Sequence, residues 1–351
     1  MQANAFALTA SILIATGCNS NVDYGEALES QAATRHSNTS GSYAADRRPS
    51  PPTRPSRDLT DSPESTPRTS SALEVLSIDD DIVEEVIADE LFGHHIAVFN
   101  MQYTGVNSAI GTFEYEGDEF GLESGIIMST GTATSAMGEN NTSQATTQHY
   151  SSGDADLNAM NDLVSFDAAA IEFDFMTSSD ELFALEFILA SEEYPEFTGS
   201  MFSDGFAVFI SETETDMDPD IDEEPQNIAL MENIDNVDCD LTEDAIGIST
   251  ITPFLNPCLY IDNDLYTNND ELVDVYDNLE GDDTQYDGFT RPLRLKIPVE
   301  RYANYRIKIV IADAMDAKFD TAVFIKSGSF QGAKHVPREP LVDAPYASKL
   351  K

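Results

Sequence analysis

Short runs of β-branched and aromatic residues follow one another along most of this 351-residue chain. Each run is bounded by Gly, Asn, Asp or Ser, and segments with helical apolar spacing are nearly absent between the runs. This pattern is typical of strands in antiparallel sheets. It predicts an all-β fold, an antiparallel β-sandwich with a jelly-roll-like arrangement. The runs are HIAVFNMQY, AIGTFEY, GIIMSTG, AAIEFDFM, LFALEFILA, DGFAVFIS, NIALM, TRPLRLKIPV, YRIKIVIADA and TAVFIKSGSF.

One segment before these runs has the spacing of a helix. Apolar residues between Val75 and Leu91 recur close to helical intervals, and Gly93 follows in the position of a C-cap. We therefore predict one short N-terminal amphipathic helix at Asp80–Leu91. The hydrophobic content of 41% is enough for a sizeable core, and we predict a single β-sandwich domain over residues 73–332.

The chain begins with an apolar stretch, FALTASILIATGC, that ends at Cys18. The stretch is too short to span a membrane as a mature helix and is typical of a secretory signal. The small residues before Cys18 resemble the cleavage site of bacterial lipoproteins, so we predict a lipoprotein-type signal peptide at 1–17 and lipidation of Cys18. The lipid would hold the exported chain at the outer membrane, the cell surface or in the periplasm. An ordinary cleaved signal is the alternative, and residues 1–6 contain no Lys or Arg, unlike most signal peptides.

The segments on either side of the predicted domain have a different composition. Residues 18–72 are rich in Ser, Thr, Pro and Arg, and such a segment buries too little apolar area to offset its ordering entropy. We predict a disordered tether there. Residues 333–351 form a predicted tail without an apolar anchor, so the N-terminal lipid would serve as the anchor.

The charge of the chain is strongly negative, with 64 Asp and Glu against 18 Lys and Arg and a formal net charge of -46. No Lys or Arg occurs between Thr69 and Thr290. A nucleic-acid partner is excluded on this ground, because phosphate binding needs positive charge. Three interpretations of the acidity remain open: a solvated or salt-adapted surface, specific Ca²⁺ sites, and a cationic partner.

Carboxylates gather in two segments that follow predicted strands, SEEYPEFTGSMFSDGF and DAMDAKFD. A hard cation such as Ca²⁺ prefers about six to eight oxygen ligands, commonly from loops. If both segments lie at one end of the sandwich, one ion would join them, and we predict Ca²⁺ as the cofactor. The alternative is that Asp313 and Asp320 cap turns and that Glu193 pairs with Arg or Lys. The predicted metal ligands are Glu192, Glu193, Asp204, Asp313, Asp316 and Asp320.

Cys239 and Cys258 are the only cysteines beyond Cys18. An exported protein reaches a compartment that permits oxidation, and lipidation of Cys18 leaves an even pair. We predict a disulfide that closes a loop of about 20 residues and stabilises the fold by roughly 3 kcal/mol. Two free thiols are the alternative.

Several blocks resemble the choice-of-anchor L domain in their order along the chain. The most distinctive are ASEEYPEF with FSDGFAVFIS, and DAMDAKFDTAVFIKSGSF, and the resemblance covers about Leu76 to Gln331. It implies a domain of bacterial secreted or surface proteins without an established biochemical activity. Members of that family use varied C-terminal anchoring devices, and the tail of this chain has none of that kind.

We predict a non-catalytic surface or periplasmic lipoprotein that presents the sandwich for adhesion or for binding an extracellular protein or glycan, with the membrane as its lipid-mediated partner. A His-dependent hydrolase is disfavoured, because none of the histidines lies in the blocks that resemble the family. A carboxylate-dependent hydrolase is one alternative, although the adjacent Glu192 and Glu193 would face opposite sides of a regular strand. A purely structural envelope protein is another.

Overall fold

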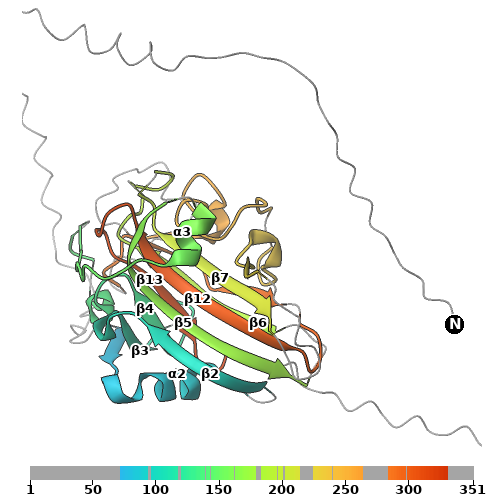
Figure 1. Cartoon of the computed structure of the whole chain (residues 1–351). Coiled ribbons are helices and arrows are strands. Elements are labelled where there is room, and N and C mark those ends of the chain that lie inside the picture. The colour runs from blue at the N-terminus through green and yellow to red at the C-terminus, as the bar shows by residue number, and fades with distance from the viewer. Residues whose placement is uncertain are drawn as a thin grey trace, which may run out of the picture. The chain divides into compact units, whose positions relative to one another are not determined.

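The structure is a computed structural model (Figure 1). It describes residues 72–93, 96–117, 120–138, 140–142, 144–161, 163–178, 183–195, 197–200, 202–213, 224–238, 240–263, 284–297 and 299–330. The predictions for the signal peptide, Cys18, the tether up to residue 71 and the tail fall outside the described residues, as does Cys239.

Strands dominate the described part of the chain. The helices are α2 (Val83–Leu91) and α3 (Ala155–Asn161), with short 3-10 turns between several strands. The strands are β1 (Leu73–Ser77), β2 (Ile96–Thr104), β3 (Ile110–Tyr115), β4 (Ser124–Ser129), β5 (Ser165–Thr177), β6 (Phe183–Ser191), β7 (Gly205–Glu212), β8 (Gln226–Asn227), β9 (Tyr260–Asp262), β10 (Gly288–Thr290), β11 (Leu293–Ile297), β12 (Asn304–Ala314) and β13 (Thr321–Lys326).

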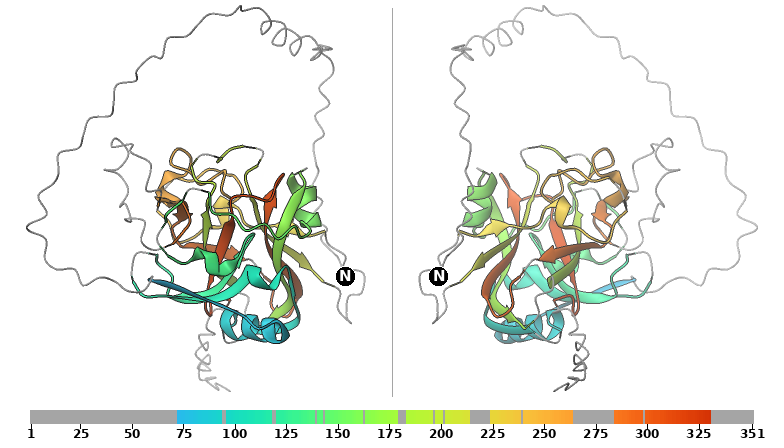
Figure 2. Two further views of the ribbon diagram at one scale, coloured as in Figure 1. Left: turned by 90° about the vertical axis from the view of Figure 1, so that its left-hand side faces the viewer. Right: turned by 90° about the vertical axis from the view of Figure 1, so that its right-hand side faces the viewer.

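These strands form two antiparallel sheets that lie as separate layers (Figure 2). The first sheet has the order β1-β3-β4-β13-β6-β10-β9, with β11 also paired to β6, and the second has the order β2-β5-β12-β7-β8. The chain passes from one sheet to the other at most of its connections, as a jelly-roll-like arrangement requires. The predicted all-β sandwich is therefore confirmed.

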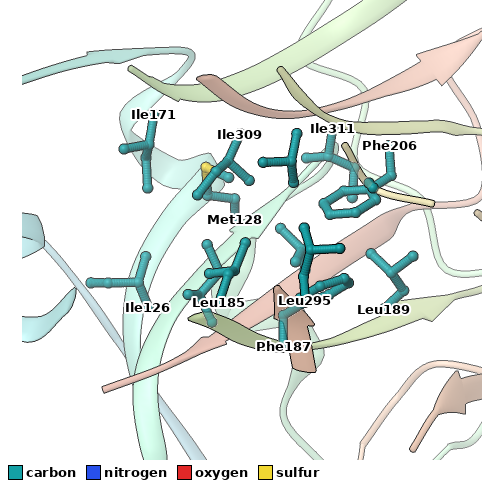
Figure 3. Packing of buried hydrophobic residues seen from close by; sticks show 14 of the residues in the cluster. Ile126, Met128, Ile171, Leu185, Phe187, Leu189, Phe206, Leu295, Ile309 and Ile311 are labelled. Carbon is teal, nitrogen blue, oxygen red and sulfur yellow. The ribbon is translucent and has the colours of Figure 1, made fainter. Parts of the chain in front are cut away.

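The space between the sheets is filled by apolar side chains. Inward-facing residues alternate with outward-facing ones, as in Ile307, Ile309 and Ile311 of β12, which are 0% exposed. Figure 3 shows Ile309 and Ile311 facing Leu185 and Phe187 of β6 across this layer. The opposite face of the first sheet carries a second apolar cluster, which includes Ile188, Ala190, Tyr286, Phe289, Ala322 and Phe324.

The N-terminal helix was predicted as one element, and the structure divides that region. Residues Asp80–Ile82 form a 3-10 turn and α2 follows at Val83–Leu91. The side chain of Asp79 accepts the N–H of Asp81 at 3.2 Å and so caps the turn. Strand β1, which precedes the turn, was missed because its apolar residues also fit helical spacing.

Helix α3 was not predicted, and its short sequence ADLNAMN has no long apolar period. Asp154 begins it by accepting the N–H groups of Asp156 and Leu157 at 3.0 Å each. The helix packs on the outer face of the second sheet (Figure 1), where small residues leave room for it. Lys308 of β12 binds the carboxylates of Asp154 and Asp156 from this face.

The run NIALM was predicted as a strand, and only its first residue belongs to one. Strand β8 ends at Asn227, whose side-chain oxygen accepts the N–H groups of Val208 and Ala229. This side chain replaces the carbonyl that a continuing strand would offer, so regular pairing stops.

One end of the sandwich collects strand ends from both sheets. Strands β4, β6 and β12 finish there, and β5, β7, β10 and β13 begin there, because neighbouring antiparallel strands run in opposite directions. We call this end the acidic end, and it comprises residues 129–131, 144–153, 165–167, 191–204 (as far as described), 284–288 and 313–321.

Candidate functional site

The acidic end buries carboxylates from both sheets. Glu192 and Glu193 follow β6, Asp204 precedes β7, Asp287 precedes β10, Asp313 lies near the end of β12, and Asp320 precedes β13. Their exposed fractions are only 1%, 1%, 6%, 0%, 2% and 4%, respectively. We call these six residues the carboxylate cluster. The two predicted segments thus lie at the same end of the sandwich, as a shared site requires.

Asp316 was predicted with this group, and the structure leaves it at the edge. Its side chain is 38% exposed and lies 3.7 Å from the ammonium group of Lys318. It contributes to the cluster only through its charge, which acts on Glu193.

Glu193 and Asp204 are joined by hydrogen bonds on the inner side of the first sheet. Glu193 Oε2 accepts the N–H of Asp204 at 2.9 Å. The two oxygens of Asp204 accept the hydroxyl of Thr321 at 2.6 Å and the N–H of Ala314 at 3.1 Å. Because Ala314 ends β12 and Thr321 begins β13, Asp204 ties the two sheets together.

An extended segment, residues 144–152, crosses the acidic end, and we call it the strap. Its N–H groups point inward at every second residue: Ala145 donates to Glu192, Thr147 to Asp320, and His149 and Ser151 both donate to Asp167. The burial of the strap residues alternates with the same period. The strap is therefore held by backbone donors that satisfy buried carboxylates.

Asp287 belongs to a buried amide network beside the strap. Its Oδ1 accepts Asn140 Nδ2 at 2.7 Å, and the same nitrogen reaches the carbonyl oxygen of Asn263 at 3.0 Å. Asn263 in turn donates its side-chain N–H groups to the carbonyl oxygens of Thr284 and Tyr286. Hydrogen bonds from Asn140 and Asn263 thus hold residues 284–287, the segment before β10.

The backbone at the acidic end is locally strained. Asp167, Met315 and Phe319 have φ values of 48°, 66° and 64°, in the left-handed region that non-glycine residues rarely adopt. Gly131 is needed for a different reason, because a Cβ there would overlap the carboxylate of Asp320. These strained and closely packed positions lie where the carboxylates come together.

Burial is the main cause of the raised pKa values of five members of the cluster, and neighbouring carboxylates add to it. The pKa is raised to about 9 for Glu192, about 8 for Glu193, about 10 for Asp313 and about 6 for Asp320, and that of Asp204 lies well above its usual range. Asp287 raises the pKa of Glu192 further, and Asp313 does the same for Glu193. Ionising these groups together requires a compensating positive charge.

Lys and Arg side chains in the described part of the chain do not supply that compensation. There, no Lys or Arg forms an ion pair with Glu192, Glu193, Asp204, Asp313 or Asp320. The alternative that Glu193 pairs with Arg or Lys finds no support among the described residues. Asp320 accepts a backbone N–H, that of Thr147, but this donor belongs to the strap and not to a turn.

Among the described residues, Oε1 of Glu192 and Oδ1 of Asp313 are buried carboxylate oxygens without a hydrogen-bond partner. Such orphaned acceptors are rare in native interiors and call for a proton or a cation. As the side chains lie, no three His, Cys, Asp or Glu residues of the described ranges converge closely enough to form a closed metal centre. Any cation here would draw some of its oxygen ligands from hydroxyl, amide and carbonyl groups or from water.

Sequence reasoning missed Asp167 and the strap. Asp167 is 1% exposed and receives two strap N–H groups. His149 of the strap is partly buried, with its Nε2 atom shielded from water, and its electrostatic interaction lowers the pKa of Asp320. The strap has no apolar period, and only its Asn, Thr and Ser content marked it as irregular.

Cys258 is disulfide-bonded. Its predicted partner, Cys239, lies outside the described residues, so the pairing between them stays a prediction.

Comparison with known proteins identifies the chain by family alone. No curated protein and no solved structure matches it significantly. Within the described residues, none of the helices has the length and apolar character needed to cross a membrane. A family model for the choice-of-anchor L domain matches residues 76–331, which is most of the chain, and the protein therefore belongs to this family of domains, typical of exported or surface-associated proteins.

Proposed function

We propose that this protein is a non-catalytic surface lipoprotein whose β-sandwich binds Ca²⁺ at its acidic end and serves in adhesion to an extracellular partner. The carrying observation is the carboxylate cluster, to which both sheets contribute and with which no described Lys or Arg forms an ion pair. Ca²⁺ suits this chemistry because it takes oxygen ligands of several kinds in flexible geometry.

The burial of the cluster favours cation binding over catalysis. Glycoside hydrolysis through two carboxylates needs both groups to reach the bond that is broken. Glu192 and Glu193 are each 1% exposed, and the strap crosses above Glu192. Loss of polymer turnover in Glu193→Gln with an unchanged free energy of unfolding would contradict this choice and favour a hydrolase.

Thermal unfolding tests the Ca²⁺ proposal. The full chain, freed of metal with EDTA and kept at low ionic strength, is unfolded with and without CaCl₂. An ion present at about 100 times its dissociation constant stabilises the folded state by about 2.7 kcal/mol, which raises Tm by about 5–10 °C. NaCl and MgCl₂ at the same ionic strength serve as controls.

Matched variants locate the effect. Glu193→Gln removes a buried carboxylate, and Glu114→Gln removes an exposed one from β3 of the same sheet. We expect the Ca²⁺ response to shrink in the first variant and to persist in the second. An equal rise in Tm with NaCl and CaCl₂ would instead indicate a salt-adapted surface.

Adhesion is supported by aromatic side chains at the acidic end. Tyr150 of the strap is 80% exposed, and Phe254, which is 83% exposed, belongs to a loop that accepts the N–H of Gly199 through Ser249. Exposed rings of this kind stack on sugars or fill apolar pockets of a partner. Their positions favour the acidic end as the binding surface.

Binding of the purified protein to immobilised extracellular polysaccharides and cell-wall fractions tests this surface. We expect Tyr150→Ala and Phe254→Ala to weaken retention. Tyr302→Ala is the matched control, because Tyr302 is 64% exposed and lies before β12, at the opposite end of the sandwich. Equal retention of all three variants would exclude the acidic end as the adhesive surface.

Lipidation of Cys18 remains part of the proposal. The wild-type chain expressed with its own N-terminus should partition into the detergent phase, and Cys18→Ala should move it to the aqueous phase. Identical partitioning of the two forms would refute lipid anchoring.

A further inference from the structure

The carboxylate cluster is divided by the first sheet. Along β6, Leu185, Phe187 and Leu189 face the layer between the sheets, whereas Ile188 and Ala190 face the opposite side. The alternation continues past the end of the strand. Glu193 accepts the N–H of Asp204 on the side of the layer between the sheets, and Glu192 interacts with Asp287 and Asp320 on the opposite side. The adjacent glutamates therefore lie on opposite sides of the sheet.

The inner group consists of Glu193, Asp204 and Asp313. Glu193 accepts the N–H of Asp204 and interacts electrostatically with Asp313, which follows the inward-facing residues of β12. The hydroxyl groups of Ser191 and Thr321, 2.7 Å apart, stand at the same place. This side offers carboxylates together with neutral oxygens.

The outer group consists of Glu192, Asp287 and Asp320. Glu192 interacts electrostatically with both aspartates, and its N–H donates to the carbonyl oxygen of Asp320 at 3.1 Å. Asp320 lies two residues before Ala322 and four before Phe324, and both of these residues belong to the outer apolar cluster. Alternate residues share a face, so Asp320 lies on the same side of the sheet. Asn263, which donates its N–H to the carbonyl oxygen of Asp287, adds a buried amide oxygen.

Each group contains a buried oxygen that lacks a hydrogen-bond partner. Oδ1 of Asp313 is the orphaned atom of the inner group, and Oε1 of Glu192 is that of the outer group, where Oδ1 of Asn263 is also unpaired. These residues are 2%, 1% and 2% exposed, respectively. Unsatisfied acceptors therefore occur on both sides of the sheet.

Charge bears on the number of ions rather than on the division, since Asp320 also interacts electrostatically with Asp204 and Asp313 of the inner group. Six ionised carboxylates carry six negative charges, so one divalent cation would leave four uncompensated in a buried region. The unpaired oxygens of Asp313 and Glu192 belong to different sides of the first sheet. Two divalent cations would neutralise most of the charge and serve both groups.

We propose that the carboxylate cluster holds two separate divalent-cation sites, an inner site on the side of Glu193, Asp204 and Asp313 and an outer site on the side of Glu192, Asp287 and Asp320. In each site fewer than three of these carboxylates bind the ion directly, and hydroxyl, amide and carbonyl oxygens or water complete its ligands. The inner ion ties the two sheets together. The outer ion ties the strap and the segment before β10 to the end of β6. This inference rests on the proposed Ca²⁺ binding and adds its stoichiometry and its division.

Calorimetric titration of the EDTA-treated full chain with CaCl₂ tests the proposal, together with metal analysis after dialysis. We expect two ions per wild-type chain and one ion per chain in both Glu193→Gln and Asp287→Asn. The double variant should bind none, and Glu114→Gln should bind two. Circular dichroism confirms that each variant is folded.

A second measurement needs no variant. Tb³⁺ replaces Ca²⁺ at oxygen sites, and Tyr286, which interacts electrostatically with Glu192, Asp313 and Asp320, lies close enough to sensitise its luminescence. We expect luminescence to rise until two equivalents of Tb³⁺ are bound and CaCl₂ to reverse the rise. One Ca²⁺ per wild-type chain, lost in either single variant, would overturn the two-site proposal and leave the proposed Ca²⁺ function standing. No bound ion at all would overturn both.

Discussion

The middle of the sandwich and its acidic end use the same strands and the same inward-facing positions with opposite chemistry. In β12, Ile307, Ile309 and Ile311 fill the layer between the sheets, and Asp313 follows them into the acidic end. The apolar middle is stable because of area removed from water, whatever the solution conditions. The acidic end is stable only when protons or cations neutralise it, so the surroundings set its contribution.

The largest expected difference between the two regions is in pH dependence. With EDTA present, burial raises the pKa of Glu192 to about 9 and that of Asp313 to about 10, whereas carboxyl groups of the unfolded chain titrate at about 4. Between these values the folded chain holds more protons, so the free energy of unfolding falls as pH rises. Each such group lowers it by about 1.4 kcal/mol per pH unit, or about 4 kcal/mol from pH 5 to 8.

Urea unfolding at pH 5, 6.5 and 8 measures this slope. Saturating CaCl₂ should flatten it, because the cation then replaces the protons as the neutralising charge. A free energy of unfolding that rises with pH in EDTA would show that the cluster is not held neutral in this way.

A cavity in the apolar middle gives the next largest effect. Phe187 is 0% exposed, with its ring centre 5.1 Å from that of Phe206 across the layer. Phe187→Ala should cost about 3–5 kcal/mol of unfolding free energy. The loss should be the same in EDTA and in CaCl₂, and a loss that depended on Ca²⁺ would show that the two regions are coupled.

Overpacking the acidic end should have an intermediate effect. A methyl group at Gly131 would overlap the carboxylate of Asp320, so Gly131→Ala should cost about 1–3 kcal/mol and weaken the Ca²⁺ response. Gly247→Ala is the matched control, because its new methyl group would meet only Thr250 Oγ1, at 3.9 Å. Thermal unfolding of both variants compares them directly, and equal behaviour would exclude close packing at Gly131.

The smallest effect is expected at the rim of the acidic end. Lys318 is 55% exposed and its ammonium group lies 3.7 Å from Asp316. Exposed pairs of this kind contribute about 0–1 kcal/mol, so Lys318→Ala should hardly change Tm in either EDTA or CaCl₂. A large loss restricted to EDTA would instead identify Lys318 as the missing counter-charge of the cluster.

The apolar middle was predictable from sequence because alternation along each strand reports which face is buried. β12 and β6 are clear cases, and their pattern led to the correct fold class. Strand β8 and helix α3 were not predictable in this way, because a side-chain acceptor at Asn227 and a cap at Asp154 decided them. These local hydrogen bonds leave little trace in hydropathy.

The acidic end was predictable only in part. The two carboxylate segments were found, but hydropathy assigns Glu192 and Glu193 to solvent, and nothing local shows that the sandwich buries them. Asp167 and the strap were missed for a related reason, since backbone N–H groups hold the strap and backbone donors are present in every sequence. The nearness of Glu192 to Asp287 was not predictable either, because it depends on the order of the strands in the first sheet.

The ties made by Asp204 have a consequence for the rate at which the domain opens. Its carboxylate binds Ala314 and Thr321, which lie 110 and 117 positions further along the chain. These bonds therefore form only after both sheets have assembled. Interactions that form after the folding transition state leave the folding rate unchanged and slow the reverse reaction. An ion bound beside Asp204 would therefore act as a kinetic clamp, prolonging the lifetime of the folded domain outside the cell, where an opened chain is exposed to proteases.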